Sequence, residues 1–200
     1  GHVGLLVLDE PPPGALRPES LEALARAVER LAGDALAHGA VLIGGEDHFS
    51  AGADVELFRQ LASADQAANL SRVFQEAFQC VEDSPKPIVA AVAGRVLGGA
   101  LELAMACHAR VAAEGATLGL PEVKLGINPG AGGTQRLPRL IGLDAALDML
   151  LDGRSIGTGE ALRLGLIDTV APPGQLREQG LRLAEQTARD DWTARRATRR

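Results

Sequence analysis

Two spacings of apolar residues alternate along the chain and predict its secondary structure. Short apolar runs bounded by Pro, Gly or polar residues are typical of buried strands, and they occupy residues 3–9, 40–45, 88–94 and 167–170. Helical patterns with matching start and stop residues occupy residues 18–31, 67–81, 143–151 and 175–189. Two shorter helices are predicted, one from the Gly98-Gly99 pair to residue 109 and one from Thr158, an expected N-cap, to Gly165.

Predicted strands alternate with predicted helices throughout the chain, which indicates an α/β protein. A length of 200 residues suits one domain with a substantial core. We assign residues 1–190 to this domain and the basic residues 191–200 to a solvated tail or a linker.

Composition narrows the range of partners. Hydrophobic residues make up 46% of the chain and charged residues 23%, which is ordinary for a folded globular protein. The formal net charge is −6, only 2% of residues are aromatic and Tyr is absent, so we expect no nucleic-acid partner. No apolar run approaches the roughly 20 residues that span a bilayer, so we expect no membrane partner.

The two cysteines and the N-terminal sequence bear on cellular location. Cys80 and Cys107 lie in apolar surroundings, the pattern of buried reduced thiols rather than of a disulfide or a metal pair. The opening GHVGLLVLD has neither a Met nor the basic segment of a signal peptide. We therefore expect a cytoplasmic protein whose reading frame begins upstream.

Two glutamates are the candidates for acid/base chemistry. Glu102 lies among apolar residues in the first turn of a predicted helix, and Glu122 follows a Pro in the next loop. If the two carboxylates converge on one cavity, repulsion raises the pKa of one of them, which leaves one neutral acid and one charged base. The alternatives are that Glu102 only complements the helix dipole, and that Glu122 forms an ion pair with Lys124 or Arg136.

Other site chemistries fit the sequence poorly. The glycine-dense residues 126–136 lack the order of a Walker A loop, and no dinucleotide-binding glycine motif follows a strand. The four histidines show no metal-ligand spacing, so we expect no metal. A serine hydrolase would have to combine Ser50 with His48 and Asp54, but no G-x-S-x-G motif surrounds that serine.

A second glycine turn precedes the predicted helix that begins near Ala53. Gly52 permits an unusual backbone angle, and the helix start at residues 53–55 directs unpaired N–H groups outward. Such groups can bind a carbonyl oxygen or an anion. The alternative is an ordinary turn between a strand and a helix.

Four segments together resemble the enoyl-CoA hydratase/isomerase (crotonase) family. They are FSAGADVELF (residues 49–58), GRVLGGALELAMACHARVA (94–112), LGLPEVKLGINPGAGGTQRLPRLIG (118–142) and DGRSIGTGEALRLGLIDTV (152–170). The details of the second and third segments are similar to the hydratase part of multifunctional β-oxidation enzymes. The resemblance implies a crotonase-like spiral of ββα units that lacks some C-terminal helices. It also implies a homotrimer, a hexamer, or a fusion to a further β-oxidation domain.

The resemblance implies a role for individual residues. The backbone N–H groups of Ala53 and Gly99 form an oxyanion hole for a thioester carbonyl. Glu102 matches the glutamate that deprotonates water, and Glu122 matches the glutamate that protonates the α-carbon. Contacts with CoA or substrate are implied for Ser50, Ala51, Gly52, Asp54, Val55, Leu97, Gly98, Pro121 and Gly130. The CoA thioester is the substrate, and no permanently bound cofactor is implied.

The presence of two glutamates favours one reaction of the family over others. Isomerase relatives generally use a single carboxylate, so the pair favours hydration of a 2-enoyl-CoA to a 3-hydroxyacyl-CoA by syn addition of water. The alternatives are a double-bond isomerase or another enolate-forming acyl-CoA enzyme, and a non-catalytic domain that binds acyl-CoA or serves assembly.

Overall fold

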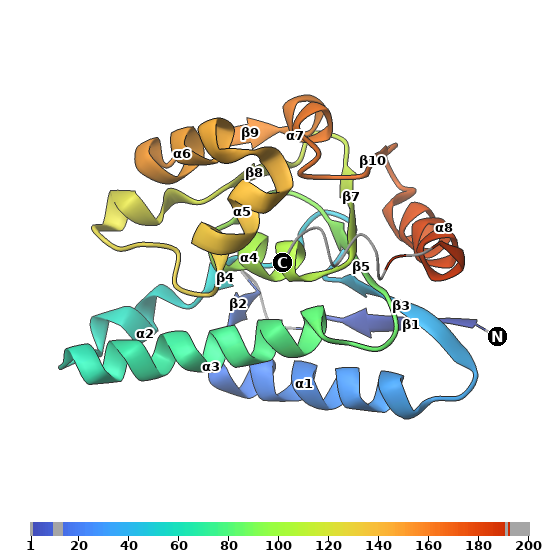
Figure 1. Ribbon diagram of the computed structural model, residues 1–200, viewed down its shortest axis with the longest axis horizontal. Coiled ribbons are helices and arrows are strands. Elements are labelled where there is room, and N and C mark those ends of the chain that lie inside the picture. The colour runs from blue at the N-terminus through green and yellow to red at the C-terminus, as the bar shows by residue number, and fades with distance from the viewer. Residues whose placement is uncertain (1, 10–13, 191, 193–200) are drawn as a thin grey trace.

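The computed structural model describes residues 2–9, 14–190 and 192, and its centre is a parallel β-sheet (Figure 1). Within these residues the sheet has five strands in the order β1-β3-β5-β7-β10. Their bounds are β1 His2–Val7, β3 Ala37–Ile43, β5 Ile88–Val92, β7 Ala109–Ala113 and β10 Thr169–Ala171. Every neighbouring pair in this sheet is parallel, as the alternation of strands and helices predicts.

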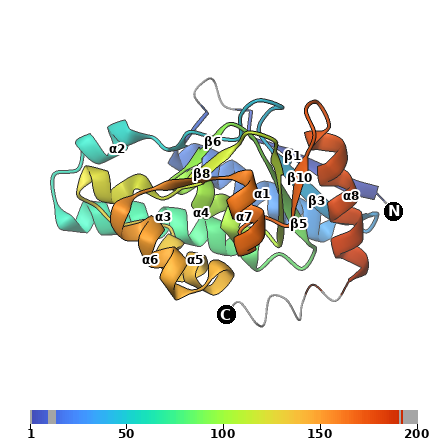
Figure 2. The ribbon, with the colours of Figure 1, turned by 90° about the horizontal axis from the view of Figure 1, so that it is seen from above.

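Both faces of this sheet are covered, which explains why its inner strands appear in the sequence as unbroken apolar runs. Along β5, Ile88, Ala90 and Val92 face one core, and the alternate residues Val89 and Ala91 face a second core. Helices α1 (Pro18–Gly33) and α3 (Ala64–Glu82) contribute to the first core, and α8 (Leu176–Arg189) covers the opposite face (Figures 1 and 2).

A repeated ββα unit organises the chain. Each of β1, β3, β5 and β7 is followed by a short strand outside the large sheet and then by a helix. The short strands are β2 (Ala15–Leu16), β4 (Gly52–Ala53), β6 (Arg95–Leu97) and β8 (Thr117–Gly119). The helices after β4, β6 and β8 are α2 (Val55–Arg59), α4 (Gly99–Ala106) and the 3-10 helix η1 (Pro121–Leu125). Strand β2 pairs with β4, and β6 pairs with β8, so the short strands join the first unit to the second and the third to the fourth.

Helix α4 lies at the centre of the molecule (Figure 1). All eight of its residues are buried, including Glu102. The chain then continues through α5 (Gly133–Ile141), α6 (Leu143–Asp152), β9 (Ser155–Gly157) and α7 (Thr158–Leu164). Strand β9 pairs antiparallel with β8, which closes the small sheet.

Several sequence predictions need correction. The helix after Gly98-Gly99 ends at Ala106, because Cys107 adopts an extended conformation and Ala109 already begins β7. The N-cap of α7 is Gly157, and Thr158 is its first residue. The short strands outside the large sheet were not predicted, since two or three residues carry too little periodicity. Helix α5 was not predicted either, because it begins in a glycine-dense segment and contains Pro138. The predicted tail lies outside the described residues, apart from Trp192.

The two cysteines differ in burial, so the expectation of two buried thiols holds for one of them. Cys107 is buried, whereas Cys80 is only half-buried, and neither forms a disulfide. Among the helices of the described residues, none combines the length and the apolar character that crossing a bilayer requires.

Candidate active site

A cavity of about 430 Å³ opens between the start of α4, η1 and the helices α2 and α3. One part of its wall is polar and is formed by Glu102, Glu122 and the glycine turn before α4. The apolar part is formed by Val55, Phe58, Leu61, Ala67, Phe74, Leu97, Leu125 and Ile127. Both candidate carboxylates therefore line one space.

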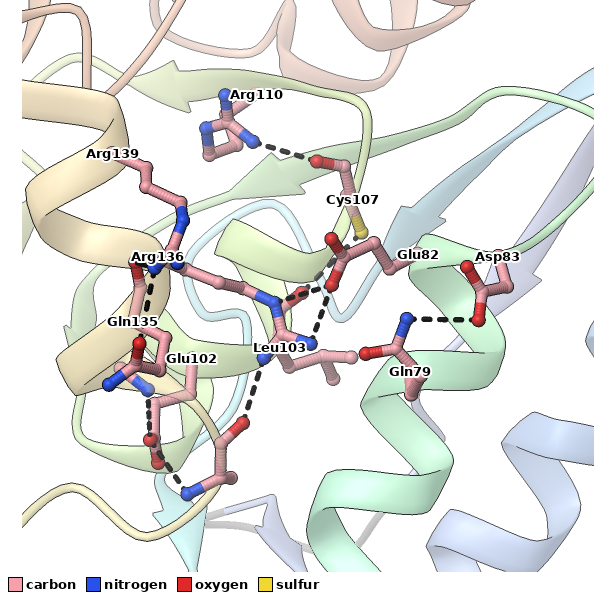
Figure 3. Close-up of polar contacts among 12 residues, drawn as sticks. Gln79, Glu82, Asp83, Glu102, Leu103, Cys107, Arg110, Gln135, Arg136 and Arg139 are labelled. Atoms are coloured by element: carbon pink, nitrogen blue, oxygen red, sulfur yellow. Dashed lines mark hydrogen bonds and ion pairs between the residues drawn. The ribbon is translucent and has the colours of Figure 1, made fainter. Parts of the chain in front are cut away.

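The carboxylate of Glu102 is held rigidly. Its residue is only 3% exposed, and Oε1 accepts hydrogen bonds from the backbone N–H groups of Ala131 and Gly133, both at 2.8 Å (Figure 3). A buried carboxylate needs such partners because water no longer solvates it. The glycine-dense loop between η1 and α5 supplies them.

Opposing effects act on the proton affinity of Glu102. Burial raises its pKa, and the N–H groups of Gly133 and Ala131, followed by the charge of Arg136, act in the lowering direction. Burial prevails, so the pKa of Glu102 lies above the usual range of a glutamate.

Glu122 lies in a different environment on η1. Its Oε2 is buried and has no hydrogen-bond partner among the described residues. Burial is the first cause that raises the pKa of Glu122 to about 7, and repulsion from Glu102 is the second; its own backbone N–H acts in the opposite direction. The expected effect of repulsion is present, but burial is the larger one.

The alternative interpretation, an ion pair of Glu122 with Lys124 or Arg136, does not hold among the described residues. Arg136 instead pairs with Glu82 at the end of α3, with an N–O distance of 2.7 Å. No ion pair joins Glu122 to Lys124 within the described residues. Among the described residues, Glu122 therefore has no ion-pair partner of opposite charge.

The glycine turn before α4 brings the backbone close to Glu122. Gly98 adopts φ 55° and ψ −129°, a conformation that residues with a side chain rarely adopt. A Cβ atom at this position would lie 2.9 Å from Glu122 Oε1. Only glycine therefore fits both the backbone angle and the approach of the carboxylate.

Two backbone N–H groups lie near each other at the same cavity. Gly99 is the first residue of α4, so its N–H has no partner inside the helix. The N–H of Asp54 donates to Leu16 C=O at 3.1 Å, and successive strand N–H groups point in opposite directions, so the Ala53 N–H points away from β2. A Cβ atom at Gly99 would lie 3.0 Å from Ala53 N. Two such donors beside two carboxylates can bind a carbonyl oxygen within reach of an acid and a base.

Six of the nine predicted substrate contacts line this cavity: Ala51, Val55, Leu97, Gly98, Pro121 and Gly130. Ser50, Gly52 and Asp54 do not. These three residues form the scaffold of the loop that carries Ala53.

The scaffold contacts explain why a hydrolase triad does not form. Ser50 Oγ donates to Gly14 C=O at 2.7 Å and accepts from the Gly52 N–H at 3.1 Å. Asp54 caps α2 through the Glu56 N–H and forms an ion pair with Arg17 at 2.8 Å. Gly52 has φ 83°, and a Cβ atom there would lie 2.7 Å from Leu97 C=O.

The sequence analysis missed the groups that hold Glu102 and most of the apolar wall. The N–H donors of Ala131 and Gly133 come from the glycine-dense segment, whose unusual composition was noticed but given no role. Contacts from α3 and from residues 125–128 depend on packing between distant segments and leave no local signal. No group of three or more His, Cys, Asp or Glu residues gathers at a metal-ligating distance in the part of the chain that the structure describes.

Comparison with known sequences gives a consistent family. The sequence profile described as Enoyl-CoA hydratase/isomerase matches residues 1–199. The chain is 52% identical over 150 residues to the peroxisomal fatty acid beta-oxidation multifunctional protein AIM1 of Arabidopsis thaliana, covering 72% of this chain and 21% of the relative. It is 42% identical over 193 residues to the fatty acid oxidation complex subunit alpha of Shewanella loihica, covering 93% of this chain and 27% of the relative.

A shorter relative and two solved structures agree with this. The chain is 45% identical over 165 residues to a probable enoyl-CoA hydratase of Bacillus subtilis, covering 82% of this chain and 64% of the relative. The structure of Pseudomonas aeruginosa DspI superposes with a TM-score of 0.89 at 37% identity, covering 98% of this chain and 81% of that one. The enoyl-CoA hydratase of Bacillus anthracis superposes with a TM-score of 0.83 at 38% identity, covering 93% and 72%.

These comparisons confirm the predicted crotonase-like α/β fold. The chain spans about a fifth to two-thirds of the length of the curated relatives that it matches.

Proposed function

The chain belongs to the enoyl-CoA hydratase/isomerase family, and from that premise we propose that it adds water to a 2-enoyl-CoA thioester to give the 3-hydroxyacyl-CoA. The observation that carries this proposal is the convergence of Glu102 and Glu122 on one cavity. Two carboxylates in different environments can serve as a base and an acid in the same turnover.

In the proposed reaction, the N–H groups of Ala53 and Gly99 bind the thioester carbonyl oxygen. They stabilise the negative charge that develops there as the enolate forms, and α4 directs the positive end of its dipole toward the same oxygen. Each such donor is typically worth about 3–4 kcal/mol of transition-state stabilisation. The proximity of the two backbone segments supports this role.

The carboxylates perform the proton transfers. Glu102 removes a proton from water as its oxygen bonds to the β-carbon, and the electron pair of the double bond moves toward the carbonyl oxygen. Glu122 in its neutral form then gives a proton to the α-carbon on the same face, which completes syn addition. Glu102 ends protonated and Glu122 ends charged, and exchange with solvent restores both. A pKa of about 7 for Glu122 suits a group that must both hold and release a proton near neutral pH.

A family isomerase is the second candidate, since the matched profile covers both activities. Isomerisation needs only one carboxylate to move a proton, whereas hydration uses both. Incubation with a 2-enoyl-CoA and, in parallel, with a 3-enoyl-CoA separates the two. Product from the first substrate alone supports hydration, and double-bond migration in the second without hydration contradicts it.

The acid role of Glu122 is tested with Glu122→Gln. We expect hydration of crotonyl-CoA to fall by roughly 10²–10⁴-fold, the usual contribution of a general acid, while binding of the CoA ester persists. Absorbance of the enoyl thioester follows hydration, and calorimetry measures binding. Glu178→Gln, which breaks an exposed ion pair on α8, is the control and should keep full activity. Undiminished turnover in Glu122→Gln would refute this role, and binding without turnover in the unaltered chain would favour the non-catalytic alternative.

The biological setting of the reaction is also part of the proposal. Two relatives carry names of multifunctional or complex-forming β-oxidation proteins, which supports a fused or associated hydratase unit. A homotrimer or hexamer stays a prediction that light scattering can check. A cytoplasmic location is likewise a prediction, and the Arabidopsis relative is named as peroxisomal.

A further inference from the structure

The loop that holds Glu102 has a cavity on either side. Gly130 and Ala131 line both the 430 Å³ cavity of the candidate site and a second cavity of about 410 Å³. The second cavity is bounded mainly by polar side chains of α3 and α5. Residues 130 and 131 therefore lie between the two spaces, and polar contacts from the second cavity add to the apolar packing of Ala131 in fixing the position of this backbone.

Polar side chains that line the second cavity form hydrogen bonds with this backbone. Arg136 Nη1 donates to the C=O of Ala131 at 2.8 Å, and the N–H of Ala131 donates to Glu102 Oε1 (Figure 3). A Cβ atom at Gly132 would lie 2.2 Å from Arg136 Nη1, so the guanidinium fits only because this residue is glycine. Gln75 adds a second contact through Nε2, which donates to the C=O of Gly130 at 2.7 Å.

Arg136 is itself fixed by Glu82 at the end of α3. Its Nε lies 2.8 Å and its Nη2 lies 2.7 Å from Glu82 Oε2. The side chains are 13% and 21% exposed, so this pair is less screened than a surface ion pair. Figure 3 shows the resulting path from Glu82 through Arg136 to the loop beside Glu102.

We propose that Glu82 and Arg136 are positioning residues for hydration, which hold the residue 131–133 backbone and thereby the carboxylate of Glu102. The proposal rests on the proposed function. Neither side chain needs to touch the substrate, because each acts through the loop. A displacement of about 1 Å at a reacting group can lower a rate by roughly 100-fold.

The charges around Glu102 affect its pKa, so the positioning role of Arg136 can also be tested through the pH dependence of the rate. Glu122 faces Glu102 from η1, Arg136 acts on it from α5, and Glu82 lies beyond Arg136 on α3. Arg136 lowers the pKa of Glu102, so its removal raises that pKa further. The acidic limb of the pH–rate profile should then move to higher pH, because a base works only when it is deprotonated.

The kinetic test uses Arg136→Gln, Glu82→Gln and the double variant. We expect kcat for hydration to fall by roughly 100-fold in Arg136→Gln and by roughly tenfold in Glu82→Gln, with KM changed less than about threefold in both. If Glu82 acts through Arg136, the double variant should match Arg136→Gln alone, since the two sites form one unit. Additive losses, or a KM effect as large as the kcat effect, would overturn the proposal.

Two further variants separate charge from geometry. Arg136→Lys keeps the charge but loses the planar fork that reaches both Glu82 and the Ala131 C=O. In Arg136→Lys the acidic limb of the pH–rate profile should therefore lie at the same pH as in the unaltered chain, while kcat stays low. Glu160→Gln breaks the more exposed pair with Arg154, whose side chains do not line the cavity, and should change neither quantity.

A spectroscopic readout keeps the inference independent of activity. The amide protons of Ala131 and Gly133 bond a carboxylate, so their NMR shifts report the position of the loop and of Glu102. We expect these two shifts to change in Glu82→Gln and not in Glu160→Gln. If these shifts change in Glu82→Gln but the unaltered chain shows no hydratase activity, the positioning role stands and the proposed function is refuted. An active enzyme with unchanged shifts and unchanged kcat in Glu82→Gln would overturn the positioning.

Discussion

Glu102 and Glu122 face the same cavity, yet they differ in the hydrogen bonds that hold their carboxylates. Glu102 lies inside a fully buried helix, and two N–H groups fix its Oε1. Glu122 lies in the short 3-10 helix η1, and in the part of the chain that the structure describes its Oε2 has no hydrogen-bond partner. Burial raises the pKa of both carboxylates, but the N–H donors to Glu102 act against that rise, whereas Glu122 Oε2 has no such donor among the described residues. Two residues of one type are thus held differently, which fits the proposal that the fixed carboxylate is the base and the other is the acid.

The largest expected effect comes from removing the fixed base. Glu102→Gln should lower kcat for crotonyl-CoA hydration by roughly 10²–10⁴-fold, because an amide cannot take a proton from water. The Gln Oε1 can still accept from Ala131 and Gly133, so the free energy of unfolding should change little. Absorbance assays and urea unfolding measure the two quantities. A variant that keeps turnover would show that the rigid carboxylate is structural.

A smaller effect should follow from disturbing the other carboxylate through the backbone. In Gly98→Ala, the new Cβ would lie 2.9 Å from Glu122 Oε1 at a residue with φ 55°. We expect kcat to fall by roughly 100-fold as Glu122 is displaced, and the free energy of unfolding to fall by about 1–2 kcal/mol from backbone strain. Gly159→Ala, at a helical position with no atom within 4 Å of the added Cβ, is the matched control. Equal kinetics in the two variants would contradict a close fit at Gly98.

The smallest effect concerns stability and pH. The pKa of Glu122 is about 7 in the folded protein and near 4.5 without its surroundings. Between these two values the folded state binds the proton of Glu122 more tightly than the unfolded state does. Protonated Glu122 therefore makes its full contribution to the free energy of unfolding below pH 4.5, and this contribution is lost as the pH rises to 7. Glu122→Gln cannot ionise and escapes this loss.

We expect Glu122→Gln to be more stable than the unaltered chain at pH 8 by about 1–2 kcal/mol, after allowance for partial solvent exposure, and to gain much less at pH 5. Urea unfolding at both pH values measures the difference, and Glu160→Gln should show no such pH dependence. If the gain were equal at pH 5 and pH 8, ionisation of Glu122 would not be its cause.

Much of the large-scale structure was accessible from local sequence. The apolar runs of β3 and β5 and the helical spacing of α1 and α3 depend on neighbouring residues, so their existence was predicted well. Their exact ends were not, as α4 shows by stopping at Ala106 where Cys107 turns extended. The α/β class and the motifs that carry the family resemblance belong to this same local information.

The sequence by itself determined which groups could do chemistry: two glutamates in apolar settings and glycine turns at helix starts. Only the tertiary structure decided their partners. In the folded protein Arg136 forms its ion pair with Glu82 rather than with Glu122. Ser50 hydrogen-bonds to the loop that carries Ala53, and the N–H groups of Ala131 and Gly133 donate to Glu102. The physical reason is that burial and hydrogen bonding depend on contacts between segments about 30 to 50 residues apart, on which local spacing carries no information.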